Sequence, residues 1–114
     1  LDEKPAGCFL CEVTTSASSE DRNNLLLYRG THCVVVMNRY PYNNGHLMVI
    51  PFDHVNDLAQ LPTPVFMELM ELFRRSIASL QLALRADGFN GGINLGKTAG
   101  AGIDAHLHFH IVPR

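Results

Sequence analysis

Three histidines alternate with apolar residues in the stretch His106-Leu107-His108-Phe109-His110-Ile111-Val112-Pro113-Arg114. Successive side chains of an extended strand point to opposite faces, so the three histidines share one face. Leu107, Phe109 and Ile111 then point to the other face, where we expect the core. Each imidazole has nitrogens that need hydrogen bonds or a metal, and packing alone gives no reason to gather three of them. The stretch therefore predicts a strand that carries a chemical site.

The length and charge of the chain limit what it can be. Its 114 residues suffice for one domain with a real core, so we expect a single domain over residues 1–114. Because the chain begins at Leu1 rather than at a methionine, we expect its termini to be incomplete. The formal net charge of −2 argues against a nucleic-acid partner, and no apolar run approaches the roughly 20 residues of a membrane span. With a Cys-x-x-Cys pair and no visible secretory leader, we expect a cytoplasmic protein.

Five short segments carry the β-branched and apolar residues typical of strands, with turn residues between them. They are residues 25–29, 32–37, 47–50, 89–95 and 107–112. Cys33, in the second segment, is expected to be a buried and inert thiol. Ser, Thr, Asn, Asp, Gly or Pro residues predict loops at 14–24, 38–45 and 96–104. Strands on both sides of one long helix predict an α+β fold with a roughly five-stranded, largely antiparallel sheet.

The long helix is predicted at residues 62–86. Thr63 can cap its start, Pro64 suits its first turn, and Asp87-Gly88 ends it. Apolar residues recur along it at steps of three and four and form one stripe: Phe66, Leu69, Met70, Phe73, Ile77, Leu80 and Leu84. The stripe indicates the face that packs on the sheet rather than a cofactor site.

Cys8 and Cys11 have the spacing of half a tetrahedral zinc site. Histidines would supply the other two ligands, and the candidates are His32, His46, His54 and the triplet. A redox pair is the alternative. Such pairs typically lie at a strand-to-helix junction, and the sequence predicts none here, so the spacing favours zinc.

A glycine-rich stretch, Asn94-Leu95-Gly96-Lys97-Thr98-Ala99-Gly100-Ala101-Gly102, comes shortly before the histidine strand. Glycines let backbone N–H groups approach an anion closely, and Lys97 adds a positive charge. A phosphate-binding loop and a plain hairpin loop both fit this composition. Its position before the three histidines favours the binding role.

Together these motifs resemble the histidine triad (HIT) family of nucleotide hydrolases and transferases, over nearly the whole chain. The family signature is His-φ-His-φ-His-φ-φ, with φ apolar, and residues 106–112 match it. A strand-loop-strand that binds the nucleoside in the family looks like Asn38-Arg39-Tyr40-Pro41-Tyr42-Asn43-Asn44-Gly45-His46-Leu47-Met48-Val49-Ile50-Pro51. The glycine-rich stretch followed by His106-Leu107-His108 looks like the bacterial branch of diadenosine tetraphosphate (Ap4A) phosphorylases and hydrolases.

This resemblance implies a role for each polar residue that matches the family. His108 would be the nucleophile that attacks an α-phosphorus and forms a covalent nucleotidyl-histidine, which water or inorganic phosphate then releases. His110 and His46 would contact the phosphate or the leaving group. Asn38 would bind the ribose hydroxyls, and Asn94 the phosphate.

One position departs from the family. Many members carry Ser or Thr shortly before the first histidine, where this chain has Gly102, Ile103 and Asp104. We expect backbone N–H groups from Gly100 to Gly102 to replace that hydroxyl. The departure leaves both phosphorolysis and hydrolysis open.

The zinc-containing members of the family imply a metal site made of Cys8, Cys11, His54 and His106. Zn²⁺ would be structural here and would tie the N-terminal segment to the histidine strand. The resemblance also implies a homodimer in which the long helix pairs with its mate.

The favoured function is nucleotidyl transfer from an adenine nucleotide substrate, with Ap4A-like dinucleoside polyphosphates as the expected class. Two alternatives stay open. One is an adenosine phosphoramidate hydrolase, and the other is a zinc-stabilised nucleotide-binding module with little turnover.

Overall fold

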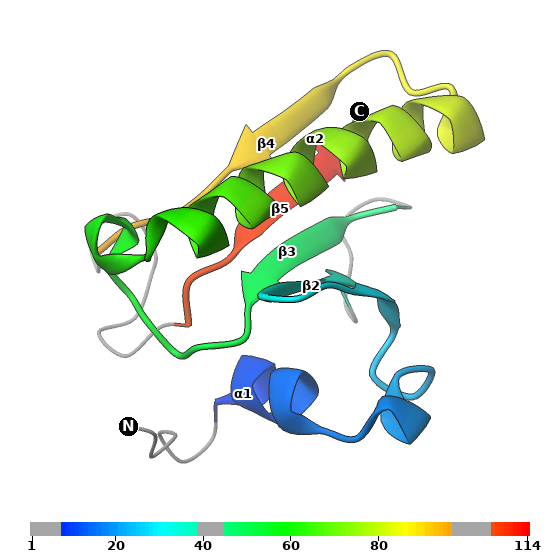
Figure 1. The fold of residues 1–114 in the computed structure, drawn as a ribbon. Helices are drawn as coiled ribbons and strands as arrows, with labels where there is room; N and C mark the ends of the chain where they lie inside the picture. Colours follow the sequence, from blue (N-terminus) through cyan, green and yellow to red (C-terminus); the bar gives the residue numbers. More distant parts are fainter. Residues whose placement is uncertain (1–7, 39–44, 97–105) are drawn as a thin grey trace.

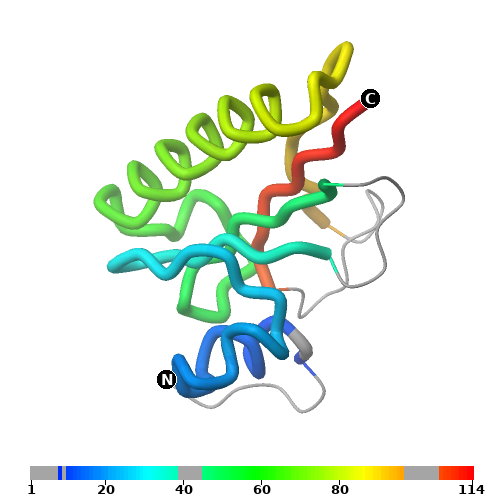
Figure 2. The backbone as a smooth tube through the Cα atoms, turned by 90° about the vertical axis from the view of Figure 1, so that its right-hand side faces the viewer, coloured from blue at the N-terminus to red at the C-terminus, as the bar shows by residue number. Residues whose placement is uncertain are grey.

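Five strands form one antiparallel sheet in the order β1-β2-β3-β5-β4 in a computed structural model that describes residues 8–38, 45–96 and 106–114 (Figure 1). The strands are β1 (Leu26–Arg29), β2 (Cys33–Met37), β3 (Leu47–Pro51), β4 (Phe89–Gly92) and β5 (Phe109–Pro113). Helix α2 (Thr63–Leu84) lies on one face and helix α1 (Phe9–Thr15) on the other (Figure 2). Two 3₁₀ turns complete the described elements, η1 (Ser18–Glu20) and η2 (Leu58–Gln60). The predicted α+β fold is confirmed.

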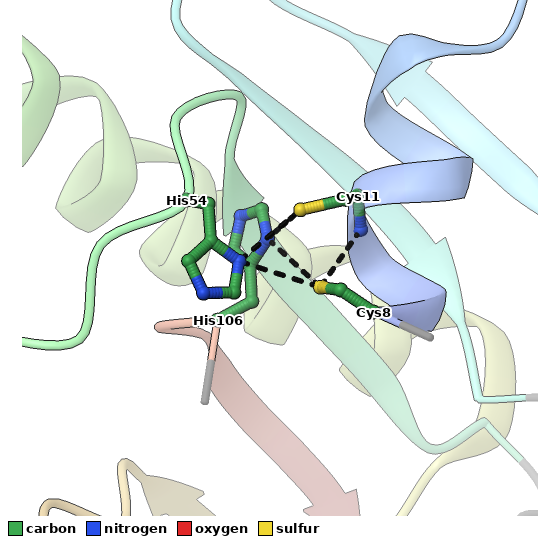
Figure 3. Close-up of side chains that lie close together, drawn as sticks. All are labelled: Cys8, Cys11, His54 and His106. Atoms are coloured by element: carbon green, nitrogen blue, oxygen red, sulfur yellow. Dashed lines mark hydrogen bonds between the residues drawn. The ribbon is translucent and has the colours of Figure 1, made fainter. Parts of the chain in front are cut away.

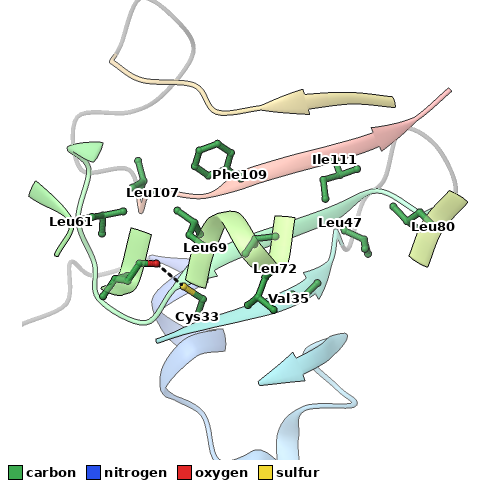
Figure 4. Packing of buried hydrophobic residues seen from close by; sticks show 12 residues of the cluster. Cys33, Val35, Leu47, Leu61, Leu69, Leu72, Leu80, Leu107, Phe109 and Ile111 are labelled. Atoms are coloured by element: carbon green, nitrogen blue, oxygen red, sulfur yellow. Dashed lines mark hydrogen bonds between the residues drawn. The ribbon is translucent and has the colours of Figure 1, made fainter. Parts of the chain in front are cut away.

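The main core lies between α2 and the sheet (Figure 4). Leu107, Phe109 and Ile111 all belong to it, as the alternation of the histidine strand predicts. Its buried members are Cys33, Val35, Leu47, Val49, Leu61, Val65, Leu69, Leu72, Leu80, Leu107, Phe109 and Ile111. Burial raises the pKa of the Cys33 thiol to about 12, so this cysteine stays protonated.

A smaller core covers the opposite face of the sheet. Val13 of α1 packs there against residues of three strands: Leu26, Val34, Val36, Met48 and Ile50. His110 of β5, and His108 just before it, point toward this same face, because their neighbours Leu107, Phe109 and Ile111 face α2. The site therefore lies on the face that α1 partly covers.

Helix α1 was not predicted: the sequence indicated no helix at residues 9–13 and a loop from residue 14. The helix has only seven residues, and helices this short are not stable alone in water. Two features outside its own propensity explain it. The Cys8 thiol accepts a hydrogen bond from the backbone N–H of Cys11 as the N-cap, and Val13 is 1% exposed in the second core.

The start of α2 differs from the prediction in its cap. Thr63 is already helical and makes no capping bond; Pro62 is the N-cap instead. The carbonyl of Pro62 accepts hydrogen bonds from the backbone N–H groups of Val65 and Phe66. Proline in the first turn is confirmed at Pro64.

The end of α2 comes two residues earlier than expected. Arg85 adopts a left-handed conformation with φ of 52°, which stops the helix at Leu84. Most of the predicted stripe packs on the core, but Leu84 is 43% exposed, so including it was wrong. Val65 and Leu72, which the stripe omitted, are buried.

Two predicted strands are shorter than expected at the ends nearest the site. Strand β4 ends at Gly92 rather than at residue 95, and β5 begins at Phe109 rather than at Leu107. Ladder pairing explains both limits, because Gly92 pairs with His110 and Val49 pairs with Phe109. None of the helices in the described residues has the length and apolar character needed to cross a membrane.

Candidate functional site

Four side chains from three separate parts of the chain meet beside α1 (Figure 3). They are Cys8, Cys11, His54 and His106, and their ligand atoms lie within 4.8 Å of one another. The Sγ atom of Cys8 is 3.4 Å from Nδ1 of His54 and 3.7 Å from Nδ1 of His106. The Sγ atom of Cys11 is 3.1 Å and 3.4 Å from the same two nitrogens. We call these four residues the metal cluster.

The metal cluster fits a tetrahedral ion. With metal–sulfur bonds of about 2.3 Å and metal–nitrogen bonds of about 2.0 Å, tetrahedral sulfur and nitrogen ligands stand about 3.5 Å apart. The four sulfur–nitrogen distances, from 3.1 to 3.7 Å, surround that value. The residues could therefore hold a metal ion with all four positions filled by protein.

Neighbouring backbone groups orient the ligands. The backbone N–H of Cys11 donates to Sγ of Cys8 over 3.2 Å, and such a bond favours the thiolate. Nε2 of His106 lies 2.8 Å from the carbonyl oxygen of Pro51. A carbonyl can only accept, so Nε2 carries the proton and Nδ1 faces the two thiols with its lone pair. Burial lowers the pKa of His106 to about 4, which keeps the imidazole neutral as a metal ligand requires.

The other three predicted histidines form a second group farther along the same face. The ring centres of His46 and His110 are 6.2 Å apart, and those of His108 and His110 are 6.4 Å apart. His46 comes from the residue before β3, which pairs with β5. His46 is buried, whereas His108 and His110 are half-buried. We call these three residues the histidine pocket.

A single hydrogen bond fixes the state of His108. Its Nδ1 lies 3.0 Å from the carbonyl oxygen of His106. The carbonyl is an acceptor, so Nδ1 must donate its proton, and Nε2 is the nitrogen that has the lone pair whenever the ring is neutral. This is the tautomer in which Nε2 of a neutral imidazole can act as a nucleophile.

His46 is held in the opposite tautomer. The side-chain amide of Asn38 lies 3.1 Å from Nδ1 of His46, and with Nδ2 as donor that ring nitrogen accepts. Burial, then the positive charges that His110 and His108 can carry, lower the pKa of His46. Burial and His108 lower the pKa of His110 in the same direction. Both rings are therefore neutral near pH 7.

The structure brings the metal ligands together as one group and the three remaining histidines as another. Asn38, expected at the ribose, stands beside His46, a contact that the sequence did not predict. Asn94 is exposed beyond the end of β4, and Gly100 and Gly102 lie outside the described residues. The sequence also gave no sign of the carbonyl of Pro51, because a backbone acceptor leaves no residue-type signal.

The Cys-x-x-Cys pair lies at the start of helix α1, and no described strand precedes this helix. Both thiols face the two histidines, and no disulfide joins them. The four residues could hold a metal ion, which favours the metal interpretation over a redox pair.

A sheet with a histidine strand and a facing histidine is the arrangement of a histidine triad protein, and the chain belongs to the HIT family, whose domain matches residues 19–114. An AP-4-A phosphorylase from Mycobacterium tuberculosis (strain H37Rv) is 43% identical over 94 residues, 82% of this chain and 48% of that protein. Adenosine 5'-monophosphoramidase HNT1 from Saccharomyces cerevisiae is 27% identical over 109 residues, 96% of this chain and 63% of that protein.

A solved structure, of a Zn-bound histidine triad family protein from Mycobacterium smegmatis, has the same fold. Its TM-score is 0.78 at 29% sequence identity, and the match covers 95% of this chain and 75% of that chain. This chain spans about half the length of the mycobacterial phosphorylases that it matches.

Proposed function

We propose that this domain transfers nucleotidyl groups from dinucleoside polyphosphates of the Ap4A type through a covalent intermediate on His108. Nε2 of His108 attacks the α-phosphorus, a P–N bond forms, and the P–O bond to the rest of the substrate breaks. Water or inorganic phosphate then attacks the same phosphorus and releases a mononucleotide or a nucleoside diphosphate. This second attack breaks the P–N bond and returns the imidazole to its starting state.

The bond from Nδ1 of His108 to the carbonyl of His106 carries this proposal. In the neutral ring it leaves the lone pair on Nε2, so no change of tautomer is needed before attack. Burial and then His108 lower the pKa of the neighbouring His110, so His110 is a neutral hydrogen-bonding group beside the proposed nucleophile.

The neighbouring groups would bind and orient the phosphate. His46, with Nδ1 accepting from Asn38, would present Nε2–H as a hydrogen-bond donor on the pocket side. His110, half-buried beside His108, would contact the leaving group. Asn94 and the N–H groups from Gly100 to Gly102 remain the predicted phosphate contacts, and Asn38 the predicted ribose contact.

The experiment that tests the proposal is a labelling assay. The protein is incubated with Ap4A radiolabelled at the α-phosphates and quenched in alkali, in which phosphohistidine bonds survive. Label should remain on the wild-type protein and be absent from His108→Gly. Protein that binds Ap4A without labelling or turnover would instead be a nucleotide-binding module. Addition of inorganic phosphate separates the two release steps, because ADP appears only in phosphorolysis.

An adenosine phosphoramidate substrate is the second candidate. It is supported by the likeness to the yeast monophosphoramidase, which extends over nearly all of this chain. The same nucleophile would break a P–N bond of the substrate in place of a P–O bond. Comparison of kcat/KM for Ap4A and for adenosine 5'-phosphoramidate under identical conditions decides between them.

Zinc is the metal we propose for the metal cluster. Two thiolates and two imidazoles are a ligand set that zinc prefers, and the likeness to a Zn-bound family member supports the choice. Bound there, zinc would supply structural cross-linking. The described ligands already fill four positions, so the site has no open position for substrate. One zinc per chain by elemental analysis is the expected result.

The proposal also includes a homodimer in the cytoplasm. Met67 and Leu82 on α2 are 61% and 85% exposed, which supports pairing through that helix. Light scattering should give twice the chain mass, and Leu82→Lys should shift the protein toward the monomer. Cysteines free of disulfides support a reducing compartment, which fractionation of cells would test.

A further inference from the structure

Strand β1 presents two large side chains at the outer edge of the sheet. Leu26 pairs with Val36 and Tyr28 pairs with Val35, so Leu27 is an extra residue between the two pairs. A bulge of this kind changes the direction of the side chains beside it. Leu27 and Tyr28 both line a groove between β1 and α2, and they are 56% and 51% exposed. This edge of the sheet therefore carries an exposed apolar surface.

The groove follows α2 for about three helical turns. Its lining includes Val35 and Leu47 of the sheet and Leu72 of the helix. On the helix side, the groove and an adjoining hollow extend from Glu68 to Ser79. At 1.5 Å per residue this stretch of helix is about 16 Å long. An open groove of this length suits a segment of protein better than a compact small molecule.

The sheet is wider than α2 alone can cover. Five strands about 4.8 Å apart span roughly 19 Å, whereas a helix is about 10 Å across. Among the described residues, those of β1 contribute nothing to the core beneath α2. A second helix beside α2 would cover β1, because packed helices stand about 8–10 Å apart. An added strand is less suitable, since the bulge at Leu27 disturbs the edge of the ladder.

The charges beside the groove leave one cation available. Arg29 and Glu71 each form an ion pair with another side chain of the chain. The carboxylate of Glu68 accepts two backbone N–H bonds of 2.8 Å each. Arg75 is exposed at the groove, and within the part of the chain that the structure describes it forms no ion pair. An acidic side chain on the occupant would complement it.

We propose that the groove between β1 and α2 binds an amphipathic helix of a protein partner. Apolar side chains at steps of three and four on that helix contact Leu27, Tyr28 and Leu72, and an acidic side chain at the margin of its apolar face pairs with Arg75. The groove lies on the α2 face of the sheet, whereas the histidine pocket lies on the face that α1 partly covers. The inference is therefore independent of the proposed nucleotide chemistry.

The test begins with a phage-displayed library of helical peptides, in which a stripe at i, i+3, i+4 and i+7 and its flanking positions are randomised. Selection on wild type should enrich apolar residues in the stripe and Asp or Glu at a flanking position. Selection on Arg75→Glu should enrich Lys or Arg at that position instead. Arg74→Glu is the matched control, because it changes the charge equally at a residue that does not line the groove. It should retain the acidic preference.

Fluorescence anisotropy with one selected peptide then measures the size of each effect. Leu27→Lys should weaken binding at least about tenfold, because a charge replaces an apolar contact at the centre of the groove. Arg75→Glu should weaken it about threefold, and replacing the peptide's acidic residue with lysine should restore the lost affinity. Far-UV circular dichroism checks that both variants fold, which is expected because both residues are exposed.

Two results would overturn the proposal. One is the absence of an enriched stripe, or enriched peptides whose binding neither variant weakens. The other comes from light scattering: if Leu27→Lys changes the wild-type protein from a dimer to a monomer, a second copy of the chain covers the groove. An unchanged mass together with weaker peptide binding supports the docking site.

Discussion

The metal cluster and the histidine pocket both contain histidines, but the two groups differ in how closely the rings approach one another and in their hydrogen-bond partners. In the cluster, four ligand atoms lie within 4.8 Å of one another. In the pocket, neighbouring ring centres stand 6.2 and 6.4 Å apart, and two of the three rings are half-buried. In the cluster the Nδ1 atoms of both histidines face thiols, whereas in the pocket Nδ1 of His108 faces a backbone carbonyl and Nδ1 of His46 faces the Asn38 amide. The hydrogen-bonding partner of each ring therefore decides which of its nitrogens donates and which keeps the lone pair in the neutral form.

This difference is sharpest between His106 and His108, two residues apart on one segment. His106 donates from Nε2 to a carbonyl and turns Nδ1 to the thiols. His108 donates from Nδ1 to a carbonyl and keeps the lone pair on Nε2. A backbone carbonyl thus selects the tautomer in both cases, and it selects opposite ones.

The largest expected effect removes the pocket's nucleophile alone. His108→Ala should lower kcat for the preferred nucleotide by at least about a thousandfold, because covalent catalysis has no substitute in the pocket. Zinc content and Tm should stay at wild-type values, since His108 is half-buried and outside the cluster. Steady-state kinetics and a thermal melt on one preparation measure both. Residual turnover within about tenfold of wild type would exclude a covalent role for this residue.

The next effect breaks the cluster alone. Cys11→Ser should lower the free energy of unfolding by at least about 2 kcal/mol, because a ligand of a site that joins α1 to the rest of the fold is lost. KM should stay nearly constant. Urea unfolding with and without a chelator gives the control: the chelator should destabilise wild type and leave Cys11→Ser unchanged. Equal destabilisation of both proteins by the chelator would contradict the assignment.

A smaller expected effect is on the pH dependence of the free energy of unfolding, to which histidines of the pocket contribute. Burial lowers the pKa of His46 and of His110, whereas an unfolded histidine has a pKa of about 6.5. The unfolded chain therefore binds more protons below about pH 6.5, and the free energy of unfolding falls as the pH drops through that window. Above about pH 6.5 these two rings no longer lower the free energy of unfolding.

His46→Gln isolates one of these groups. Its free energy of unfolding should fall less steeply between about pH 6.5 and pH 5 than that of wild type, by up to about 1.4 kcal/mol per pH unit. Metal release affects both proteins alike, so the difference between their urea midpoints measures His46. Parallel pH profiles would show that this ring titrates normally in the folded state.

The smallest effect probes the contact that the sequence did not predict. Asn38→Ala removes the side-chain bond to Nδ1 of His46 and should lower kcat/KM by about three- to tenfold. Asn38→Asp offers only acceptors, so it should pull a proton onto Nδ1 and raise the pKa of His46. Steady-state kinetics and ring NMR of both variants measure this. If neither variant changed kcat/KM or the pKa of His46, Asn38 would have no role in the histidine pocket.

The strands of the sheet and the long helix could be predicted because their apolar residues recur with the period of a strand or of a helix. Alternation gave the core positions Leu107, Phe109 and Ile111 correctly, and steps of three and four gave the buried face of α2. Strand ends could not be predicted, since they depend on where a partner strand stops. Gly92 ends β4 opposite His110, and no feature of residues 93–95 announces this.

The candidate site, like the fold, could be predicted only where local sequence decides it. The spacing of Cys8 and Cys11 predicted a metal, but the sequence pattern alone could not choose among His32, His46 and His54. That choice depends on topology: β3 lies next to β5, so the residue that follows β3 reaches the start of the histidine segment. Family resemblance supplied what the pattern lacked. Helix α1 escaped prediction because tertiary contacts, more than its own propensity, hold its seven residues.

The scatter of the four cluster residues along the chain has a consequence for synthesis. His106 is the last ligand that a ribosome adds, long after the two cysteines have left the exit tunnel. Until then the cluster lacks one of its four ligands, and α1 lacks part of what holds it. The segment that carries His108 is made at the same moment as the residue that completes the cluster. Completion of the metal cluster and of the histidine pocket therefore both wait for residues 106–110, and a nascent domain without them has neither.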